Sequence, residues 1–499
     1  MLIKMSEIRT RLAPSPTGSI HIGTLQKVLY SYAWAKKNGG KYVLRIEDTD
    51  RKRYVEGAEE EIYDVHRRLG IVIDESPEAG GPFSPYRQSE RLPMYKLAAE
   101  KLVDEGHAYY AFETVEELQE WRTQMEQSGQ RTPFRGKARD LSPAEQRSEA
   151  QGKQFVIRLK MPASEIVEFE DLIMGKISVN TDTLDDYVIF KSDGFPTYHL
   201  AVVVDDNAMK ISHVFRGVEW LPTLPVHVLI YRYLGFDLPQ IAHIPNILDP
   251  KGGKLSKRSG SVAALDFLKE GYLPEAIMNF MMLLGWSPKS DEEIFSLEEF
   301  VARFELSGFN KSNPVFNRDK LNWFNEKYIR AMSASELTKS LLKWAQEFHP
   351  ARLDGIVSGL GMDKLEAAVG LEQERVVLLA DLPEKLELFS SYLLEKGELP
   401  AHKQTDKLSS TQKRAILQAY IGKTSAGLNS HEEWEQAVRE IAENLEFKAG
   451  QVFMLLRLAI TGASASPPLF EFAQIIGQAE ELRRLELVLS RLPQDEAPS

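Results

Sequence analysis

The sequence predicts an α/β protein in which a parallel sheet covered by helices is interrupted by an inserted α+β domain and followed by all-helical C-terminal domains. Three observations support this prediction. Strand and helix patterns alternate over the first 70 residues, which is typical of a parallel sheet. From about residue 113 the pattern changes to a polar helix and short strands, as expected of an insertion. Beyond about residue 333, nearly every segment has the periodicity of an amphipathic helix.

The first four elements are defined by apolar periodicity and by the turn residues between them. We expect a strand over residues 7–13, ended by a turn with two prolines and a glycine. A helix over 25–37 ends at an Asn-Gly-Gly turn. A second strand over 42–46 leads into a turn with two aspartates, and a second helix covers 58–69.

The middle of the chain contains the expected insertion. A polar helix is predicted over 114–127, a basic loop over 131–140, and short strands over 155–159, 166–169 and 177–179. Further strands are expected over 186–191 and 243–248. The C-terminal helices are predicted at 336–348, 363–379, 410–420, 432–444, 450–460 and 469–489. The domains suggested by these changes are 1–110, 111–190, 191–260, 261–332 and 333–499.

Length and composition restrict the class of protein. With 499 residues, 43% hydrophobic and 27% charged, the chain is long enough for about three globular domains and is not a disordered or fibrous protein. It has no cysteine, which excludes disulfides, thiolate zinc sites, iron–sulfur clusters and a cysteine nucleophile. The net charge of −12 excludes a protein that coats nucleic acid in general, but it allows a local basic face that binds a polyanion. The sequence has no signal peptide or membrane span, so we expect a cytoplasmic protein without membrane contact.

Two motifs could bind phosphate. The first covers residues 11–24, where the first strand ends, a tight turn follows and a helix begins with His21 and Gly23. The positive end of a helix dipole attracts phosphate, and a glycine lets a nucleotide approach the backbone. The second is a loop over 251–260 with four cations and three glycines, including Lys254 and Lys257. Each motif alone is more often a plain helix start or a solvated loop, but together they favour a triphosphate site.

Taken together, these motifs resemble a known family. Ala-Pro-Ser-Pro-Thr-Gly at 13–18 with His-Ile-Gly-Thr at 21–24, and Lys-Leu-Ser-Lys-Arg at 254–258, resemble the paired signatures of class I aminoacyl-tRNA synthetases. The segments 45–50, 85–90 and 191–200 narrow the resemblance to bacterial-type glutamyl-tRNA synthetases, over nearly the whole chain. This resemblance implies a doubly wound, Rossmann-type sheet with its ligand at the carboxyl ends of the strands.

The resemblance implies an ATP-dependent glutamate–tRNA ligase. Glutamate and ATP, with Mg²⁺, would form glutamyl-adenylate, and the glutamyl group would pass to the 3′ end of tRNA-Glu. Catalysis would depend on His21, Lys254 and Lys257. The residues matching family positions that bind glutamate are Arg11, Ala13, Ser15, Glu47, Tyr198 and Arg216. Those matching ATP positions are His21, Gly23, Glu219, Trp220, Lys254 and Lys257.

A dicarboxylic amino acid needs two cationic partners and one anion for its ammonium group. Arg11 and Arg216 would supply the guanidinium groups and Glu47 the anion. Which arginine takes which carboxylate stays open, with Arg11 preferred for the γ-carboxylate. At Val202 many family members have asparagine, so one polar substrate contact is missing or replaced. Many relatives bind zinc through cysteines near residues 110–112, and since this chain has none there, we expect no zinc.

The C-terminal helices resemble the anticodon-binding region of the bacterial enzymes. Arg375 matches the arginine that reads the third anticodon base in discriminating members, and Arg457 is a weaker candidate for anticodon contact. The family suggests a monomer. Two alternatives are a related nucleotidylyltransferase, which would not need the helical C-terminal region, and a tRNA-binding protein with an inactive site. A truncated relative that glutamylates a modified tRNA base also lacks this helical region.

Overall fold

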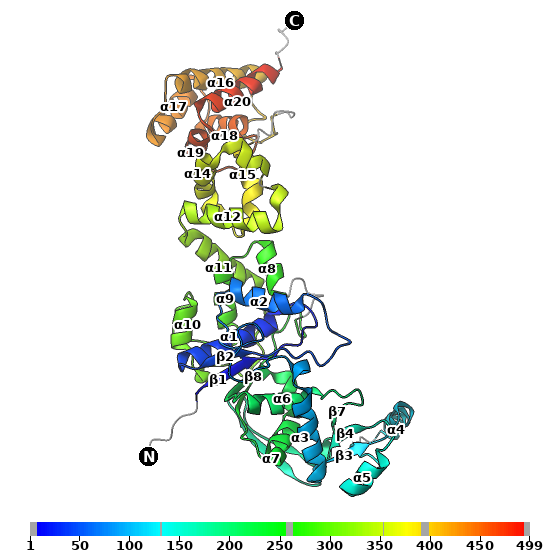
Figure 1. Cartoon of the computed structure of the whole chain (residues 1–499). Coiled ribbons are helices and arrows are strands. Elements are labelled where there is room, and N and C mark those ends of the chain that lie inside the picture. Colours follow the sequence, from blue (N-terminus) through cyan, green and yellow to red (C-terminus); the bar gives the residue numbers. More distant parts are fainter. Residues whose placement is uncertain (1–6, 130–131, 256–262, 353, 391–398, 494–499) are drawn as a thin grey trace. The chain divides into compact units, whose positions relative to one another are not determined.

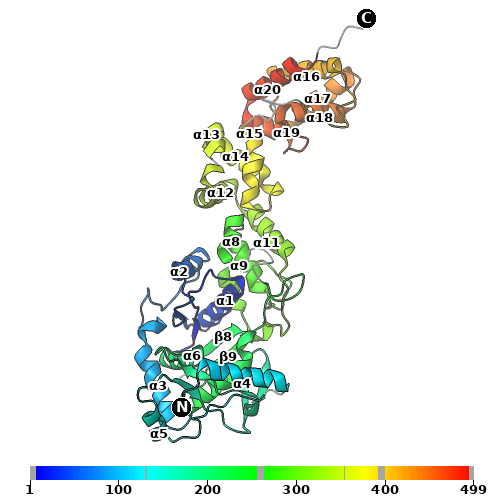
Figure 2. The ribbon, with the colours of Figure 1, turned by 90° about the vertical axis from the view of Figure 1, so that its right-hand side faces the viewer.

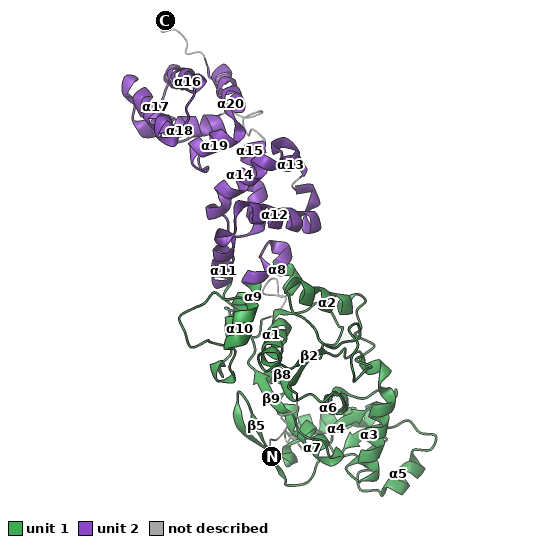
Figure 3. Cartoon of the chain, turned by 60° about the vertical axis from the view of Figure 1, so that its left-hand side comes forward, with its two compact units in different colours: residues 1–267, 277–318 green, residues 268–276, 319–499 purple. Residues whose placement is uncertain are grey.

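The chain folds into two compact units in a computed structural model that describes residues 7–129, 132–255, 263–352, 354–390 and 399–493. Unit 1 comprises residues 1–267 and 277–318, and unit 2 comprises residues 268–276 and 319–499 (Figure 3). No helix of the described residues is both long and apolar enough to cross a membrane.

A six-stranded sheet forms the centre of unit 1, with the strand order β2-β1-β8-β9-β5-β6. Strand β1 pairs in parallel with β2 and β8, β8 with β9, and β9 with β5, while β5 and β6 form an antiparallel hairpin. The strands are β1 Arg9–Leu12, β2 Lys41–Leu44, β5 Ile166–Asp171, β6 Gly175–Asn180, β8 His213–Gly217 and β9 Gln240–Ile244. The α/β fold class and its parallel sheet are therefore confirmed.

Helices connect and cover the parallel strands, because a parallel pair needs a crossover. Helix α1 packs against β1, β2 and β8 (Figure 1), and its buried face includes Leu25, Leu29 and Ala33. Helices α3 and α7 pack on α6, the helix that follows the insertion. The helices are α1 Ile22–Lys37, α2 Ala58–Arg68, α3 Leu92–Asp104, α6 Tyr198–Ala208 and α7 Leu224–Leu234. Next in the chain, before the C-terminal helices, come α8 Ala264–Glu270, α9 Pro274–Leu283, α10 Leu297–Arg303 and α11 Arg318–Ala331.

The insertion has its own antiparallel sheet, β3-β4-β7, shown in cyan and green in Figure 1. Its elements are β3 Ala108–Ala111, α4 Val115–Ser128, α5 Pro143–Glu149, β4 Val156–Leu159 and β7 Val188–Phe190. The strands expected over 166–169 and 177–179 are present, but they form the β5–β6 hairpin at the edge of the main sheet. Alternation along β5 buries Val167 and Phe169, and this pattern fits either sheet equally well.

Unit 2 contains the predicted amphipathic helices. In both views α16, α17, α18 and α20 gather into one bundle (Figures 1 and 2). Two predicted helices are shorter than expected, because α14 ends at Glu372 and a break at Gly477 separates α19 from α20. Gly477 has φ +89°, a conformation that glycine adopts without strain. The helices are α12 Ala334–Phe348, α13 Asp354–Leu360, α14 Met362–Glu372, α15 Leu382–Ser390, α16 Ser410–Ser425, α17 His431–Asn444, α18 Ala449–Thr461, α19 Leu469–Ile476 and α20 Gln478–Arg491.

Candidate active site

A cavity of about 1190 Å³ lies where β1, β2 and β8 end at their carboxyl termini. Because β1 lies between β2 and β8, this is the point where strand order reverses, the usual ligand site of an open α/β sheet. Backbone hydrogen bonds join the chain at the end of β1 to the segment that follows β2. They run from Arg45 N to Leu12 O and from Glu47 N to Pro14 O. Eight of the predicted site residues line this cavity: Arg11, Ala13, Ser15, Glu47, Tyr198, Arg216, Glu219 and Trp220.

The start of α1 has the geometry expected of a phosphate site. His21 caps the helix, and its Nδ1 accepts a hydrogen bond from the Gly23 N–H at 3.0 Å. In the neutral ring the proton is therefore on Nε2, which can donate to an anion. A Cβ at Gly23 would lie 3.3 Å from His21 Nδ1, so the cap and the glycine fit together closely. Thr24 lines the cavity, whereas His21 and Gly23 lie beside its lining.

A lysine that the sequence analysis did not select also lines the cavity. Lys27 Nζ donates to the Gly23 carbonyl at 2.8 Å, one turn into α1. Burial lowers the pKa of Lys27 to about 8, while Glu219 opposes the shift and Lys254 adds to it. Lys254 Nζ lies 3.9 Å from Glu219 Oε1, which links the second motif to the cavity wall. Lys257 lies outside the described residues.

Arg11 and Arg45 share a buried aspartate on α6. Asp206 accepts from Arg45 Nη1 at 2.6 Å and from Arg11 Nε at 3.2 Å. Burial would raise the pKa of Asp206, but the charges of Arg11 and Arg45 hold it below its usual range. Arg45 also donates from Nη2 to Glu47 Oε1 at 3.0 Å. The ion pair with Asp206 thus holds Arg11 at the cavity wall.

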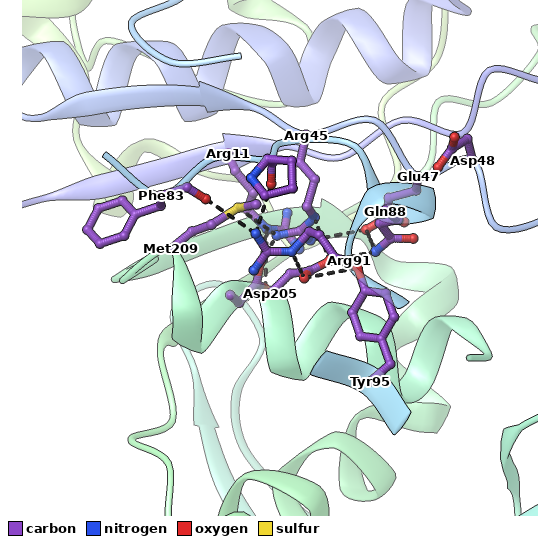
Figure 4. Close-up of polar contacts among 12 residues, drawn as sticks. Arg11, Arg45, Glu47, Asp48, Phe83, Gln88, Arg91, Tyr95, Asp205 and Met209 are labelled. Atoms are coloured by element: carbon purple, nitrogen blue, oxygen red, sulfur yellow. Dashed lines mark hydrogen bonds and ion pairs between the residues drawn. The ribbon is translucent and has the colours of Figure 1, made fainter. Parts of the chain in front are cut away.

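The neighbouring aspartate anchors a second network, shown in Figure 4. Asp205 is fully buried and accepts from Arg91 Nε at 2.7 Å, from Gln88 Nε2 at 2.9 Å and from Tyr95 Oη at 2.9 Å. Gln88 Nε2 also lies 3.4 Å from Glu47 Oε1. The sequence signal for this network was the acidic pair after Val202-Val-Val in an apolar helix, because charged groups in such a setting are paired.

Glu47 combines deep burial with cationic neighbours. Burial raises the pKa of Glu47 to about 7, against the opposing charges of Arg45 and Arg11. It is only 6% exposed, yet it lines the cavity, so an ammonium group bound there would favour its ionised form.

The opposite wall combines Arg216 with aromatic groups. Arg216 Nη1 lies 3.4 Å from Tyr198 Oη, and the Tyr198 ring packs on Trp220 with centroids 4.2 Å apart. Arg216 Nη2 is buried and has no hydrogen-bond partner among the described residues. Val202, four residues after Tyr198, is buried in the hydrophobic core.

The two arginines proposed for tRNA contact lie near one another in unit 2. Arg375 follows α14 in a short 3₁₀ turn, not in the predicted helix, and its Nη1 lies 3.2 Å from the buried carboxylate of Glu372. Arg457 donates to the carbonyl and hydroxyl oxygens of Ser466 at 3.1 and 3.0 Å. Burial lowers the pKa of Arg457, and the charge of Arg375 lowers it further.

The part of the chain that the structure describes contains no group of three His, Cys, Asp or Glu side chains that could hold a metal ion. In the inserted domain, Tyr109 Oη donates to Asp186 at 3.0 Å and accepts from Gly136 N at 2.8 Å. Arg139 Nε also donates to Asp186, at 2.9 Å. Hydrogen bonds and an ion pair thus connect the segments of the inserted domain here.

Comparison with known proteins gives consistent matches along the chain. Residues 7–323 match the family described as "tRNA synthetases class I (E and Q), catalytic domain", and residues 336–489 match an "Anticodon binding domain". A glutamate–tRNA ligase of Alkaliphilus metalliredigens is 40% identical, with 98% of this chain and 100% of that protein covered. One from Thermus thermophilus is 41% identical, with 96% and 99% covered. The crystal structure of a glutamate tRNA ligase from Elizabethkingia meningosepticum, in complex with its amino acid, matches with a TM-score of 0.88 at 35% identity, covering 98% of this chain and 100% of that one.

Proposed function

Because the chain belongs to the class I tRNA synthetases of the E and Q family, as its motifs suggested, we propose that it ligates glutamate to the 3′ end of tRNA-Glu through a glutamyl-adenylate. The observation that carries this proposal is the pairing of two buried arginines with a buried glutamate in one cavity. Arg11, Arg216 and Glu47 all line it. They complement a small molecule with two carboxylates and one ammonium group.

In the first step a carboxylate oxygen of glutamate attacks the α-phosphorus of ATP. The bond from that phosphorus to the bridging oxygen of the β-phosphate breaks, and pyrophosphate leaves. ATP enters with Mg²⁺, which neutralises part of the phosphate charge. No protein nucleophile is needed, so the protein acts by positioning and by electrostatic stabilisation.

The start of α1 and the basic loop would hold ATP. His21 Nε2–H and the helix dipole would face phosphate oxygens, and Lys254 with Lys257 would balance the charge that develops on pyrophosphate. Gly23, Glu219 and Trp220 would lie beside the adenosine. Lys27, half-buried next to Gly23, would add one further cation to this side of the cavity.

In the second step the 2′-oxygen of the terminal tRNA adenosine attacks the carbonyl carbon of the adenylate. AMP leaves with the electrons of the broken carbon–oxygen bond, and the hydroxyl proton is released. Unit 2 would contact the anticodon through Arg375 and Arg457. In this proposal the enzyme acts as a monomer in the cytoplasm.

ATP–pyrophosphate exchange tests the proposal most directly. We expect exchange with glutamate, stimulated by tRNA-Glu, and little exchange with glutamine or aspartate under the same conditions. Exchange with a different small molecule would indicate a nucleotidylyltransferase instead. Absence of exchange, together with tight tRNA binding, would indicate a tRNA-binding protein without catalytic activity.

A further inference from the structure

Arg216 is held in the sheet by a histidine on the adjacent strand. Arg216 of β8 and His243 of β9 are partners in the parallel register, so their side chains lie side by side. Arg216 Nε donates to His243 Nε2 at 3.0 Å, and both side chains are buried. Since a guanidinium can only donate, His243 Nε2 must carry a lone pair.

A buried aspartate on β5 determines this tautomer. Asp171 Oδ2 lies 2.6 Å from His243 Nδ1, and its Oδ1 accepts from the backbone N–H groups of Ile173 and Met174. With Nδ1–H donating to Asp171, Nε2 of the neutral ring is left to accept from Arg216. Burial would raise the pKa of Asp171, but the hydrogen bonds from His243 and from the backbone hold it below its usual range.

A second imidazole holds the other side of the guanidinium. Arg216 Nη1 lies 3.0 Å from His227 Nδ1, and His227 Nε2 lies 3.0 Å from His199 Nδ1. Because the guanidinium can only donate, Nδ1 of His227 accepts from Arg216, and the proton of the neutral ring is on Nε2, which donates to His199. The chain of bonds therefore runs from Arg216 through two neutral histidines on α7 and α6.

The two cavity arginines thus differ in the charge of their partners. Arg11 donates to Asp206, an anion that offsets its charge. Arg216 donates to two imidazoles, and its Nη2 has no partner among the described residues. We propose that His243 and His227 are positioning residues that hold Arg216 on uncharged acceptors, so that its full positive charge remains available for a carboxylate of the amino-acid substrate. This inference rests on the proposed function.

The electrostatics of the histidines agree with this arrangement. Burial lowers the pKa of His227 well below its usual range, and the charge of Arg216 lowers it further. For His243 burial also lowers the pKa and outweighs the opposing hydrogen bond to Asp171. Both rings are therefore neutral at physiological pH and do not repel the guanidinium.

The test compares an uncharged with a charged acceptor at one position. His227→Gln and His227→Glu present side chains of nearly equal size that can accept from Arg216, but only glutamate adds a negative charge. We expect the glutamate KM of His227→Glu to exceed that of His227→Gln at least tenfold, with equal ATP KM in ATP–pyrophosphate exchange. The same pair of substitutions at His213, at the other end of β8, serves as the control.

Asp171→Asn provides a second, independent measurement. An asparagine amide can donate to His243 Nδ1, which would move the ring proton to Nε2 and set it against Arg216 Nε–H. We expect a glutamate KM at least tenfold above the parent's, with the ATP KM unchanged. Equal glutamate KM in the His227 pair, or an unchanged value in Asp171→Asn, would overturn the positioning role. If the parent chain itself shows no glutamate-dependent exchange, the proposed function fails first.

Discussion

Glu47 is a buried acid whose charge state should control substrate binding. Burial raises its pKa from an ordinary 4.5 to about 7, so below pH 7 the folded protein keeps Glu47 protonated and neutral. Because only the carboxylate can balance an ammonium group, we expect the glutamate KM to fall as the pH rises from about 6 to about 8. In Glu47→Gln this dependence should vanish and the KM should be higher throughout. A pH profile of exchange for the two proteins checks this.

The raised pKa of Glu47 also affects the stability of the fold. A rise in pH favours substrate binding but lowers the contribution of Glu47 to stability. Between about pH 4.5 and pH 7 the unfolded chain releases the Glu47 proton while the folded chain keeps it. The folded state therefore binds more protons, and this group lowers the free energy of unfolding as the pH rises through that window. Substrate binding favours the ionised form of Glu47 and therefore offsets part of this decrease in the free energy of unfolding.

The basic loop provides a second prediction for a single residue. Lys257 belongs to the second signature, and a cation that meets charge developing on pyrophosphate stabilises the transition state more than the ground state. Lys257→Ala should lose roughly 10²–10³ in kcat, the usual effect of removing a positioned donor, with little change in glutamate KM. Lys251→Ala in the same loop is the matched control. Activity within a few-fold of the parent would leave Lys257 as an ordinary loop residue.

The inserted sheet β3-β4-β7 is expected to fold without zinc. The chain has no cysteine to bind zinc, and Tyr109, Asp186 and Arg139 form a hydrogen-bonded network in this domain. Elemental analysis should find no stoichiometric zinc, and a chelator should leave the melting temperature unchanged. Tyr109→Phe should lower the melting temperature, because Asp186 and the Gly136 N–H each lose a hydrogen-bond partner. The expected loss in the free energy of unfolding is about 1–3 kcal/mol. One zinc per chain would contradict this prediction.

In the proposed function, unit 1 activates the amino acid, and unit 2, which contains the match to an anticodon binding domain, reads the anticodon. Arg375 pairs with Glu372, and its guanidinium lies close enough to Arg457 for its charge to lower the pKa of Arg457. An unpaired cytosine offers two acceptors on its pairing edge, which suits a donor-only guanidinium, whereas guanine mainly offers donors there. The third anticodon base is C for tRNA-Glu and G for tRNA-Gln.

We therefore expect the protein to charge tRNA-Glu and reject tRNA-Gln. A good bidentate contact contributes about 1–3 kcal/mol of discrimination, so the ratio of kcat/KM should be roughly fivefold to about 150-fold. Arg375→Gln should move the ratio toward one, whereas Arg439→Gln, an exposed arginine on α17, should not. A parent ratio near one would show that Arg375 serves only its ion pair with Glu372.

Much of the fold was predictable because the signals are local. Alternation of strands and helices predicted β1, α1, β2 and α2 within a few residues, and amphipathic periodicity predicted the helices of unit 2. The break at Gly477 was missed because apolar periodicity continues across it, and only a left-handed glycine separates α19 from α20. Most of the proposed cavity residues came from motifs next to strand ends, where parallel strands bring their loops together.

The fold class, the family signatures and the absence of cysteine chemistry could be derived from the amino-acid chain alone, because each depends on residue types at short spacing. The three-dimensional structure was needed to show that the hairpin β5–β6 joins the main sheet and that Asp171, His243 and Arg216 form one chain of hydrogen bonds. These residues come from three strands far apart in the sequence. Their contact depends on strand order and pairing register, and local periodicity carries no information about which distant strand lies alongside.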